Sequence, residues 1–190
     1  MSTLETRIFE IVKDARHTID PNAKTLVLDP ELVAVARRRS EDMAAKNYMA
    51  HVSPDGQTSA TLIMDVDADF EGLLGENIAA QYYVKQSGVD VNTFAQRFVQ
   101  TWLDSPQHKE NLAFAAYDRS GVGAAVNGDT IYVTELFATD LGLPRNPADP
   151  KRRKAVAVDH PKSEPTAEMP TLGENVPVPA PRPDIPNTAR

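Results

Sequence analysis

The prolines of this 190-residue chain are concentrated near its C-terminal end. Eleven of the fifteen lie between Pro144 and Pro186, in a stretch with few aromatic or branched apolar residues. Such a stretch buries too little apolar surface to offset the entropy lost on ordering, so we expect it to be extended or disordered as an isolated chain. The fold is therefore predicted to lie in residues 1–143. Residues 144–190 form a Pro-rich tail, a candidate docking segment for a protein partner or a neighbouring subunit.

Composition excludes several classes of protein. Hydrophobic residues make up 41% of the chain, enough for a core, and the net charge of −7 disfavours a nucleic-acid binder. The chain has no cysteine, which excludes disulfides and thiolate chemistry. The first twenty residues contain Glu5, Glu10 and Asp14 and do not form a signal peptide, and no apolar run is long enough to be a transmembrane segment. The chain is then cytoplasmic, has lost a leader, or is exported by another route, including inside a larger particle.

Apolar residues recur at helical spacing in three segments. The first helix covers about residues 4–15. The second has Asp29 as N-cap and Pro30 at its first position, and it should end before His51. A third helix is predicted to start near Asn92 as N-cap.

A short fourth helix is predicted with Ser105 as N-cap and Pro106 at the first position. Between the second and third helices, residues 78–83 fit either a short strand or an extended loop. After the fourth helix the apolar pattern alternates, and Asn127-Gly128 is a two-residue hairpin signal followed by a strand over 130–138. The chain is therefore predicted to be α+β, with most helices preceding an antiparallel hairpin.

Two of the four histidines stand beside turn residues at the ends of helical segments. His51 follows the second predicted helix, and His108 is the third residue after its N-cap. The positive end of the helix dipole disfavours an imidazolium at His108, and a neutral imidazole is what a metal ligand or general base requires. The alternative is that His108 only caps its helix or packs against neighbouring side chains. A second histidine in a similar turn context weakens this alternative.

Two glutamates stand in unusual settings. Glu135 is in phase with Ile131 and Val133 along the last predicted strand, so on a buried face it would need a histidine or metal partner or would have to be neutral. Alternation fits equally well a solvent-facing Glu135. Glu76 lies between Gly75 and Asn77, a triplet that taken by itself is better explained by an ordinary turn.

Taken together, six segments resemble the CAP superfamily (cysteine-rich secretory, antigen five and pathogenesis-related proteins), in its bacterial, cysteine-free SCP-like form. The similarity covers about residues 3–139. The segments, in chain order, are Asp42-Met43-Ala44, His51-x-Ser53-Pro54-Asp55-Gly56, Gly75-Glu76-Asn77-Ile78-Ala79, Trp102-x-x-Ser105-Pro106-x-His108-x-x-Asn111-Leu112, Gly121-Val122-Gly123 and Tyr132-Val133-Thr134-Glu135-Leu136-Phe137-Ala138.

The resemblance implies a three-layer α-β-α sandwich with a small antiparallel sheet and a central cleft. In the family, two His and two Glu line that cleft and can bind a divalent cation such as Zn²⁺. By matching motifs, His51, Glu76 and His108 take three of these places.

At the fourth place this chain differs from many eukaryotic members of the family. Those members carry a Glu three residues after the tryptophan, and this chain has Ser105 there. Glu135 is the candidate replacement, and Asp104 is a weaker one. The metal set expected from the resemblance is thus His51, His108, Glu76 and Glu135.

Three functions are compatible with these residues. The favoured one is a non-catalytic binding module that acts outside the cell or at a surface, with a divalent cation, and a lipid or small ligand as a candidate occupant of the cleft. The second is a structural component of a particle, filament or envelope complex that docks through residues 144–190. The third is a metal-assisted hydrolase or protease in which Glu76 or Glu135 is the base.

Overall fold

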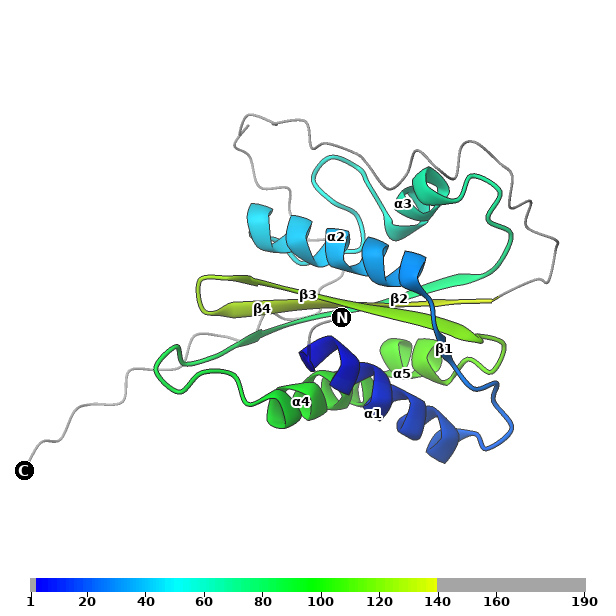
Figure 1. Cartoon of the computed structure of the whole chain (residues 1–190), viewed down its shortest axis with the longest axis horizontal. Coiled ribbons are helices and arrows are strands. Elements are labelled where there is room, and N and C mark those ends of the chain that lie inside the picture. Colours follow the sequence, from blue (N-terminus) through cyan, green and yellow to red (C-terminus); the bar gives the residue numbers. More distant parts are fainter. Residues whose placement is uncertain (1–2, 140–190) are drawn as a thin grey trace, which may run out of the picture.

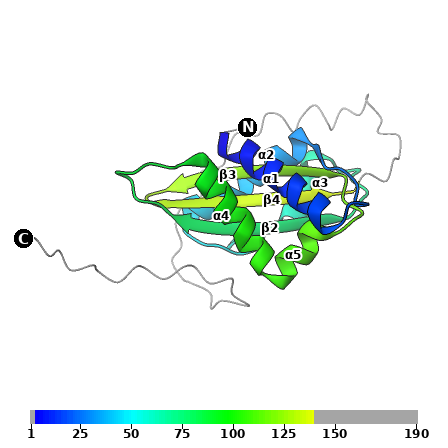
Figure 2. The same ribbon diagram turned by 90° about the horizontal axis from the view of Figure 1, so that it is seen from below.

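A four-stranded sheet lies between two layers of helices in the computed structural model, which describes residues 3–139 (Figure 1). This arrangement confirms the predicted α+β, three-layer fold. Helices α2 and α3 cover one face of the sheet, and α1, α4 and α5 cover the other, as the view in Figure 2 also shows. The elements are α1 (Thr3–Ile19), β1 (Val27–Leu28), α2 (Pro30–Lys46), α3 (Ser59–Val66), β2 (Leu74–Tyr82), α4 (Val91–Asp104), α5 (Pro106–Ala113), β3 (Arg119–Asn127) and β4 (Thr130–Ala138).

The strands are ordered β1-β3-β4-β2. The three long strands pair antiparallel, whereas β1 pairs parallel with β3. The three long strands thus form the predicted small antiparallel sheet, and the parallel β1, which was not predicted, makes the whole sheet mixed. The two-residue β1 carried no alternation from which it could have been predicted.

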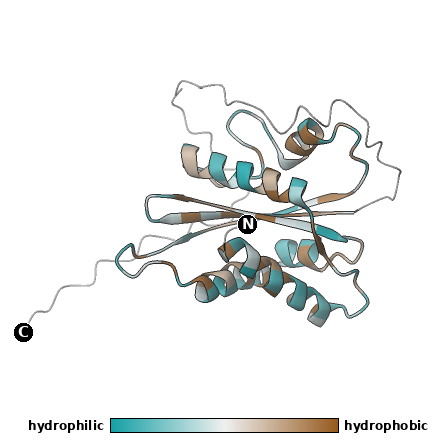
Figure 3. Ribbon diagram, viewed as in Figure 1, coloured by the Kyte–Doolittle hydropathy of each residue, from teal (hydrophilic) through white to brown (hydrophobic). Residues whose placement is uncertain are grey.

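Strand β4 is central, and all nine of its residues are buried. Leu136 packs in the cluster beneath α2 and α3, whereas Val133 and Phe137 pack with α1 and α4 on the other face. Figure 3 shows hydrophobic and hydrophilic residues alternating around the helices of both layers, as expected where each helix covers one face of a sheet. A strand covered on both faces has no solvent side, so alternation alone could not assign its residues to inner and outer faces.

The predicted start of α2 is confirmed. The Asp29 carboxylate accepts hydrogen bonds from the N–H of Glu31 at 2.8 Å and of Leu32 at 3.3 Å, and Pro30 takes the first helical position. The helix ends at Lys46, and Asn47 follows in the left-handed region with φ 52°, so the helix stops before His51 as predicted.

The other two helix starts differ in detail. Helix α4 is capped by Asp90, whose carboxylate accepts from the Thr93 N–H at 2.8 Å, so the prediction of Asn92 as N-cap was wrong by two residues. Helix α5 begins at Pro106 as predicted, although Ser105 makes no side-chain capping hydrogen bond.

The hairpin between β3 and β4 is shifted by one residue from the prediction. Asn127 pairs with Thr130, so the turn residues are Gly128, with φ 63°, and Asp129. Asn127 remains in the strand, where its side-chain amide donates to the carbonyl of Ala44 at 2.7 Å.

The segment between α2 and α4 is more regular than the sequence indicated. Helix α3 was not predicted; Thr58 caps it and exchanges hydrogen bonds with Thr61. Residues 78–83 largely belong to strand β2, which settles the alternative between strand and loop. No helix within residues 3–139 has the length and apolarity needed to span a bilayer. The predicted boundary at 143 and the tail at 144–190 lie outside the described residues.

Candidate functional site

His51 and Glu76 form the central contact of the candidate site. His51 Nδ1 lies 2.6 Å from Glu76 Oε1. The His51 side chain is about half exposed, at 54%, whereas that of Glu76 is 10% exposed. A carboxylate oxygen only accepts hydrogen bonds, so Nδ1 carries a hydrogen, and in the neutral form of this imidazole the lone pair is on Nε2. The pair thus fixes which imidazole nitrogen is available as a ligand.

Two further groups hold the second oxygen of Glu76. Ser59, the first residue of α3, donates a hydrogen bond from Oγ to Oε2. Arg39 Nε forms an ion pair with the same oxygen at 3.5 Å, and the Arg39 side chain is 1% exposed. The Arg39 guanidinium also donates to the carbonyl of Ala50 at 2.8 Å, directly before His51. Arg39 therefore contacts both the carboxylate and the turn that carries its histidine partner.

His108 lies in the first turn of α5 and is 5% exposed. Burial lowers its pKa below the ordinary value, and the nearby charge of His51 lowers it further. Its Nδ1 is buried and has no hydrogen-bond partner among the described residues. The neutral imidazole predicted from the helix dipole is thus also favoured by burial, which is the main cause of the shift.

The Gly75-Glu76-Asn77 triplet connects the sheet to both sides of the site. Neighbouring residues of a strand point to opposite faces, so Glu76 points toward α2 and α3 while Gly75 and Asn77 point toward α5. Asn77 Nδ2 donates to the His108 carbonyl at 3.0 Å. At Gly75, an added Cβ would lie 2.2 Å from Asn111 Oδ1, so the glycine permits α5 to approach the strand. The triplet is a strand segment, and the alternative of a plain turn was wrong.

Since β2 is at an edge of the sheet, residues from both faces can meet there. The Glu76–His51 pair comes from the α2 side, and His108 comes from the α5 side. Glu76 contacts His51, and its neighbour Asn77 donates to the His108 carbonyl, so both histidines lie beside the same segment of β2. The structure thus brings three of the four predicted residues to one edge.

Glu135 belongs to a different cluster. It pairs in register with Asn77 and therefore shares the face of α5, opposite to that of Glu76. Its side chain is fully buried, and Ser120 Oγ donates to Oε1 at 2.9 Å. Burial raises the pKa of Glu135 to about 8, against the opposing effects of Ser120 and of the Arg16 charge. The carboxyl is therefore mainly neutral at pH 7.

This placement decides between the two predictions made for Glu135. The buried alternative is confirmed and the solvent-facing one is wrong, because β4 is covered on both faces. The groups that act on the Glu135 carboxyl are Ser120, through a hydrogen bond, and Arg16, through its charge. Arg16 is itself held by four carbonyl oxygens, those of Leu112 (2.5 Å), Phe114 (3.0 Å), Tyr117 (3.0 Å) and Lys24 (3.3 Å).

Within residues 3–139, no set of three or more His, Asp or Glu side chains lies close enough together to hold a metal ion. The donor set at the β2 edge is smaller than the resemblance implied. It consists of two imidazoles, one of which is oriented by Glu76.

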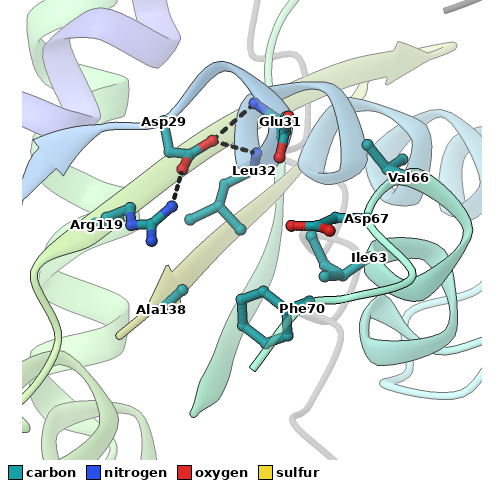
Figure 4. Close-up of a pocket in the computed structure, with 9 residues that line it drawn as sticks. All are labelled: Asp29, Glu31, Leu32, Ile63, Val66, Asp67, Phe70, Arg119 and Ala138. Carbon is teal, nitrogen blue, oxygen red and sulfur yellow. Dashed lines mark hydrogen bonds and ion pairs between the residues drawn. The ribbon is translucent and has the colours of Figure 1, made fainter. Parts of the chain in front are cut away.

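Two cavities of the described residues lie elsewhere. The one in Figure 4, between the start of α2, α3 and the end of β4, has a volume of about 10 Å³, which is no more than a water molecule needs. Its polar lining includes the ion pair of Arg119 with Asp29 at 3.0 Å, together with Glu31 and Asp67. The other is an open groove of about 390 Å³ between the start of β2 and α5. Neither is lined by His51, Glu76 or His108.

Two residues of the site were missed in the sequence. Arg39 is spaced with Val35, Ala36 and Met43 on the buried side of α2, and a charge at such a position indicates a buried partner. Ser59 carried no comparable signal, because α3 itself was not predicted.

The family model for the cysteine-rich secretory protein family (CAP) matches residues 14–139. Two uncharacterized Bacillus subtilis proteins are similar: YkwD, 26% identical over 67% of this chain and 45% of its own length, and the membrane protein YlbC, 30% identical over 72% of this chain and 34% of its own. The chain thus spans less than half the length of these curated relatives.

Three solved structures share the fold. An extracellular SCP-domain protein from Bacillus anthracis is 29% identical with a TM-score of 0.56, covering 72% of this chain and 40% of that one. An outer surface protein from Borrelia burgdorferi is 24% identical with a TM-score of 0.56, covering 69% and 88%. NaASP2, solved with Zn²⁺, is 14% identical with a TM-score of 0.52, covering 72% and 80%.

Proposed function

The chain belongs to the cysteine-rich secretory protein (CAP) family, and from this premise we propose that it is a non-catalytic binding module in which His51 and His108 bind a divalent cation. The observation that carries the proposal is the 2.6 Å contact of His51 Nδ1 with Glu76 Oε1, beside the buried imidazole of His108.

The donors at this edge fit a cation of the zinc type. Metal-binding histidines usually donate their second ring nitrogen to a carboxylate, which orients the ring, and Glu76 serves His51 in this way. His108 offers a neutral imidazole with a buried, unpartnered Nδ1 within the described part of the chain. Imidazole nitrogens suit zinc, copper and nickel. The ion would supply a Lewis-acidic position for an oxygen or nitrogen of a bound ligand.

The number of protein donors favours binding over catalysis. Catalytic zinc sites ordinarily have three protein ligands, whereas two imidazoles are the donors proposed here and Glu76 is engaged by Ser59 and Arg39. The site also lacks the hydrogen bond that activates a nucleophilic serine. Ser59 donates to the Glu76 carboxylate, whereas a nucleophilic serine donates to an imidazole base. Ser53 accepts a hydrogen bond from the Gln57 N–H at 2.9 Å within its own turn.

The proposal includes a location outside the cell or at a surface. It is supported by the 29% identical protein from Bacillus anthracis, which is extracellular. Zinc is the first probe because NaASP2, which has the same fold, was solved with Zn²⁺.

Isothermal titration of the full chain with Zn²⁺ tests the proposal. We expect the wild type to bind one ion and the His51→Ala and His108→Ala variants to lose most of the heat. His17→Ala is the matched control, because His17 is exposed at the end of α1 and away from the β2 edge. Equal heats in the wild type and in the His51→Ala/His108→Ala double variant would refute the cation site.

A further inference from the structure

Arg39 brings a positive charge into the core of the protein. Its side chain is 1% exposed and lies on the buried side of α2. A buried ion pair is a weak source of stability, because removing the charges from water costs about as much as their attraction returns. Apolar residues of similar volume often replace such pairs without loss of stability. A charge at this position therefore indicates that Arg39 places its partners, in addition to any contribution it makes to the stability of the fold.

Each nitrogen of the Arg39 guanidinium has a different partner. Nη1 donates to the Tyr48 hydroxyl at 3.0 Å, and Nη2 donates to the Ala50 carbonyl at 2.8 Å. Nε forms an ion pair with Glu76 Oε2 at 3.5 Å. The guanidinium is planar and its N–H groups point in fixed directions, so one side chain holds three acceptors at set positions. A lysine ammonium has the same charge but is a single point, and it cannot contact all three.

The segment that carries His51 is bound to α2 on both sides of the histidine. Before His51, the Tyr48 hydroxyl donates to Asp42 of α2 at 2.5 Å. After His51, Asp55 forms an ion pair with Lys46, the last residue of α2. The hydrogen bond from the guanidinium to the carbonyl of residue 50 lies between these two contacts, directly before the imidazole. The outer contacts hold the segment on α2, and the guanidinium links its centre to the carboxylate of β2.

We propose that Arg39 is a positioning residue that sets His51 against Glu76 and thereby selects the Nδ1–H form of the imidazole. One rigid group holds both the backbone before His51 and the second oxygen of Glu76, so the partners of the 2.6 Å contact keep one separation. The selection matters because the imidazole is about half exposed, and water offers either ring nitrogen an alternative partner. Zinc binding needs the lone pair on Nε2, so the consequence for zinc rests on the proposed function.

The tautomer of His51 in the metal-free full chain tests the proposal. NMR spectra that correlate the ring nitrogens with the carbon-bound ring protons distinguish Nδ1–H from Nε2–H, and His51→Gln assigns the signals. They are recorded at alkaline pH, where an imidazole is neutral. The wild type is compared with Arg39→Lys and with the matched control Arg16→Lys. Arg16 is also buried, at 2% exposed, and donates to backbone carbonyls, but it lies in α1 on the other face of the sheet.

We expect the wild type to have the Nδ1–H form. Arg39→Lys should shift the ratio of the two forms toward Nε2–H by about threefold or more, the effect of weakening one hydrogen bond. Arg16→Lys should lower the melting temperature and leave the ratio unchanged. If Arg39→Lys does not fold, Tyr48→Phe, which frees one arm of the guanidinium, should shift the ratio in the same direction. An unchanged ratio in the folded variant would overturn the proposal, because Arg39 would then serve the core alone.

Zinc titration of the same variants separates this role from the proposed function. If the wild type binds zinc, Arg39→Lys should bind it about 10-fold more weakly, as expected for the loss of a group that orients a ligand. Unchanged zinc affinity in Arg39→Lys would overturn the consequence for zinc. If the tautomer shifts on substitution but the wild type does not bind zinc, the cation site is refuted and the positioning role of Arg39 is supported.

Discussion

Replacing the buried glutamate of β4, Glu135→Gln, should change how stability depends on pH. Glutamine has almost the same shape and can still accept the hydrogen bond that Ser120 donates to Oε1 at 2.9 Å. It cannot ionise. The difference between wild type and variant therefore isolates the cost of placing a carboxylate in the core.

The magnitude follows from the pKa of Glu135, which burial raises from 4.5 to about 8. Below pH 4.5 the carboxyl is protonated in the folded and the unfolded chain, so it adds no pH dependence. Above that value the unfolded chain ionises first and is stabilised, so the free energy of unfolding falls by up to about 1.4 kcal/mol per pH unit. The decrease is complete near pH 8 and amounts to at most about 5 kcal/mol.

Urea denaturation of the full-length wild type and Glu135→Gln at intervals from pH 5 to pH 9 measures this effect. Other ionisable groups titrate in both proteins and cancel in the difference. We expect the wild type to lose stability relative to the variant as pH rises. A difference that is independent of pH, or a wild type that gains stability with rising pH, would refute the reasoning. The second result would mean that the charge of Arg16 outweighs burial and keeps Glu135 ionised.

Four further substitutions have defined outcomes. Gly75→Ala places a Cβ 2.2 Å from a side-chain amide oxygen of α5, and should lower the free energy of unfolding by about 1–3 kcal/mol in urea melts. Gly123→Ala places it 2.1 Å from a backbone nitrogen of α2, which cannot move away alone, so the loss should be larger, about 3 kcal/mol or more. Asp29→Ala removes two capping hydrogen bonds at the start of α2, and should cost about 1–2 kcal/mol in the same melts. Glu76→Gln should weaken zinc binding by about 10- to 100-fold in calorimetry, and because it leaves the buried Arg39 charge unpaired it should also lower the melting temperature; unchanged affinity would exclude its role in orienting His51.

Local sequence signals predicted the parts of the fold that local chemistry determines. Asp29 and Pro30 mark the start of α2 because capping and a fixed φ depend on neighbouring residues only. The hairpin was predicted one residue early because Asn127 is held in its strand by a distant carbonyl, that of Ala44. A contact between residues so far apart in the chain leaves no local pattern.

The residues of the candidate site were also predicted only in part. His51, Glu76 and His108 were selected from their motifs, and the structure brings them to one edge of the sheet. Glu135 was assigned to the same site because the family resemblance implies a fourth ligand and its phase was compatible with burial, but phase does not say which of two covered faces a residue occupies. Arg39 was overlooked because its partner, Glu76, lies on another element.

Strand β2 contacts α5 through Asn77 and the α2 side through Glu76, and it is paired along only one of its edges. Sliding this strand by a single residue against β4 would exchange the two faces, turning the carboxylate toward α5 and the amide toward α3. Both histidines would then lose their supports at once. Correct pairing of β2 with β4 is thus a condition for assembling the site as well as for closing the sheet, and mutations that loosen this pairing should impair ligand binding before they unfold the protein.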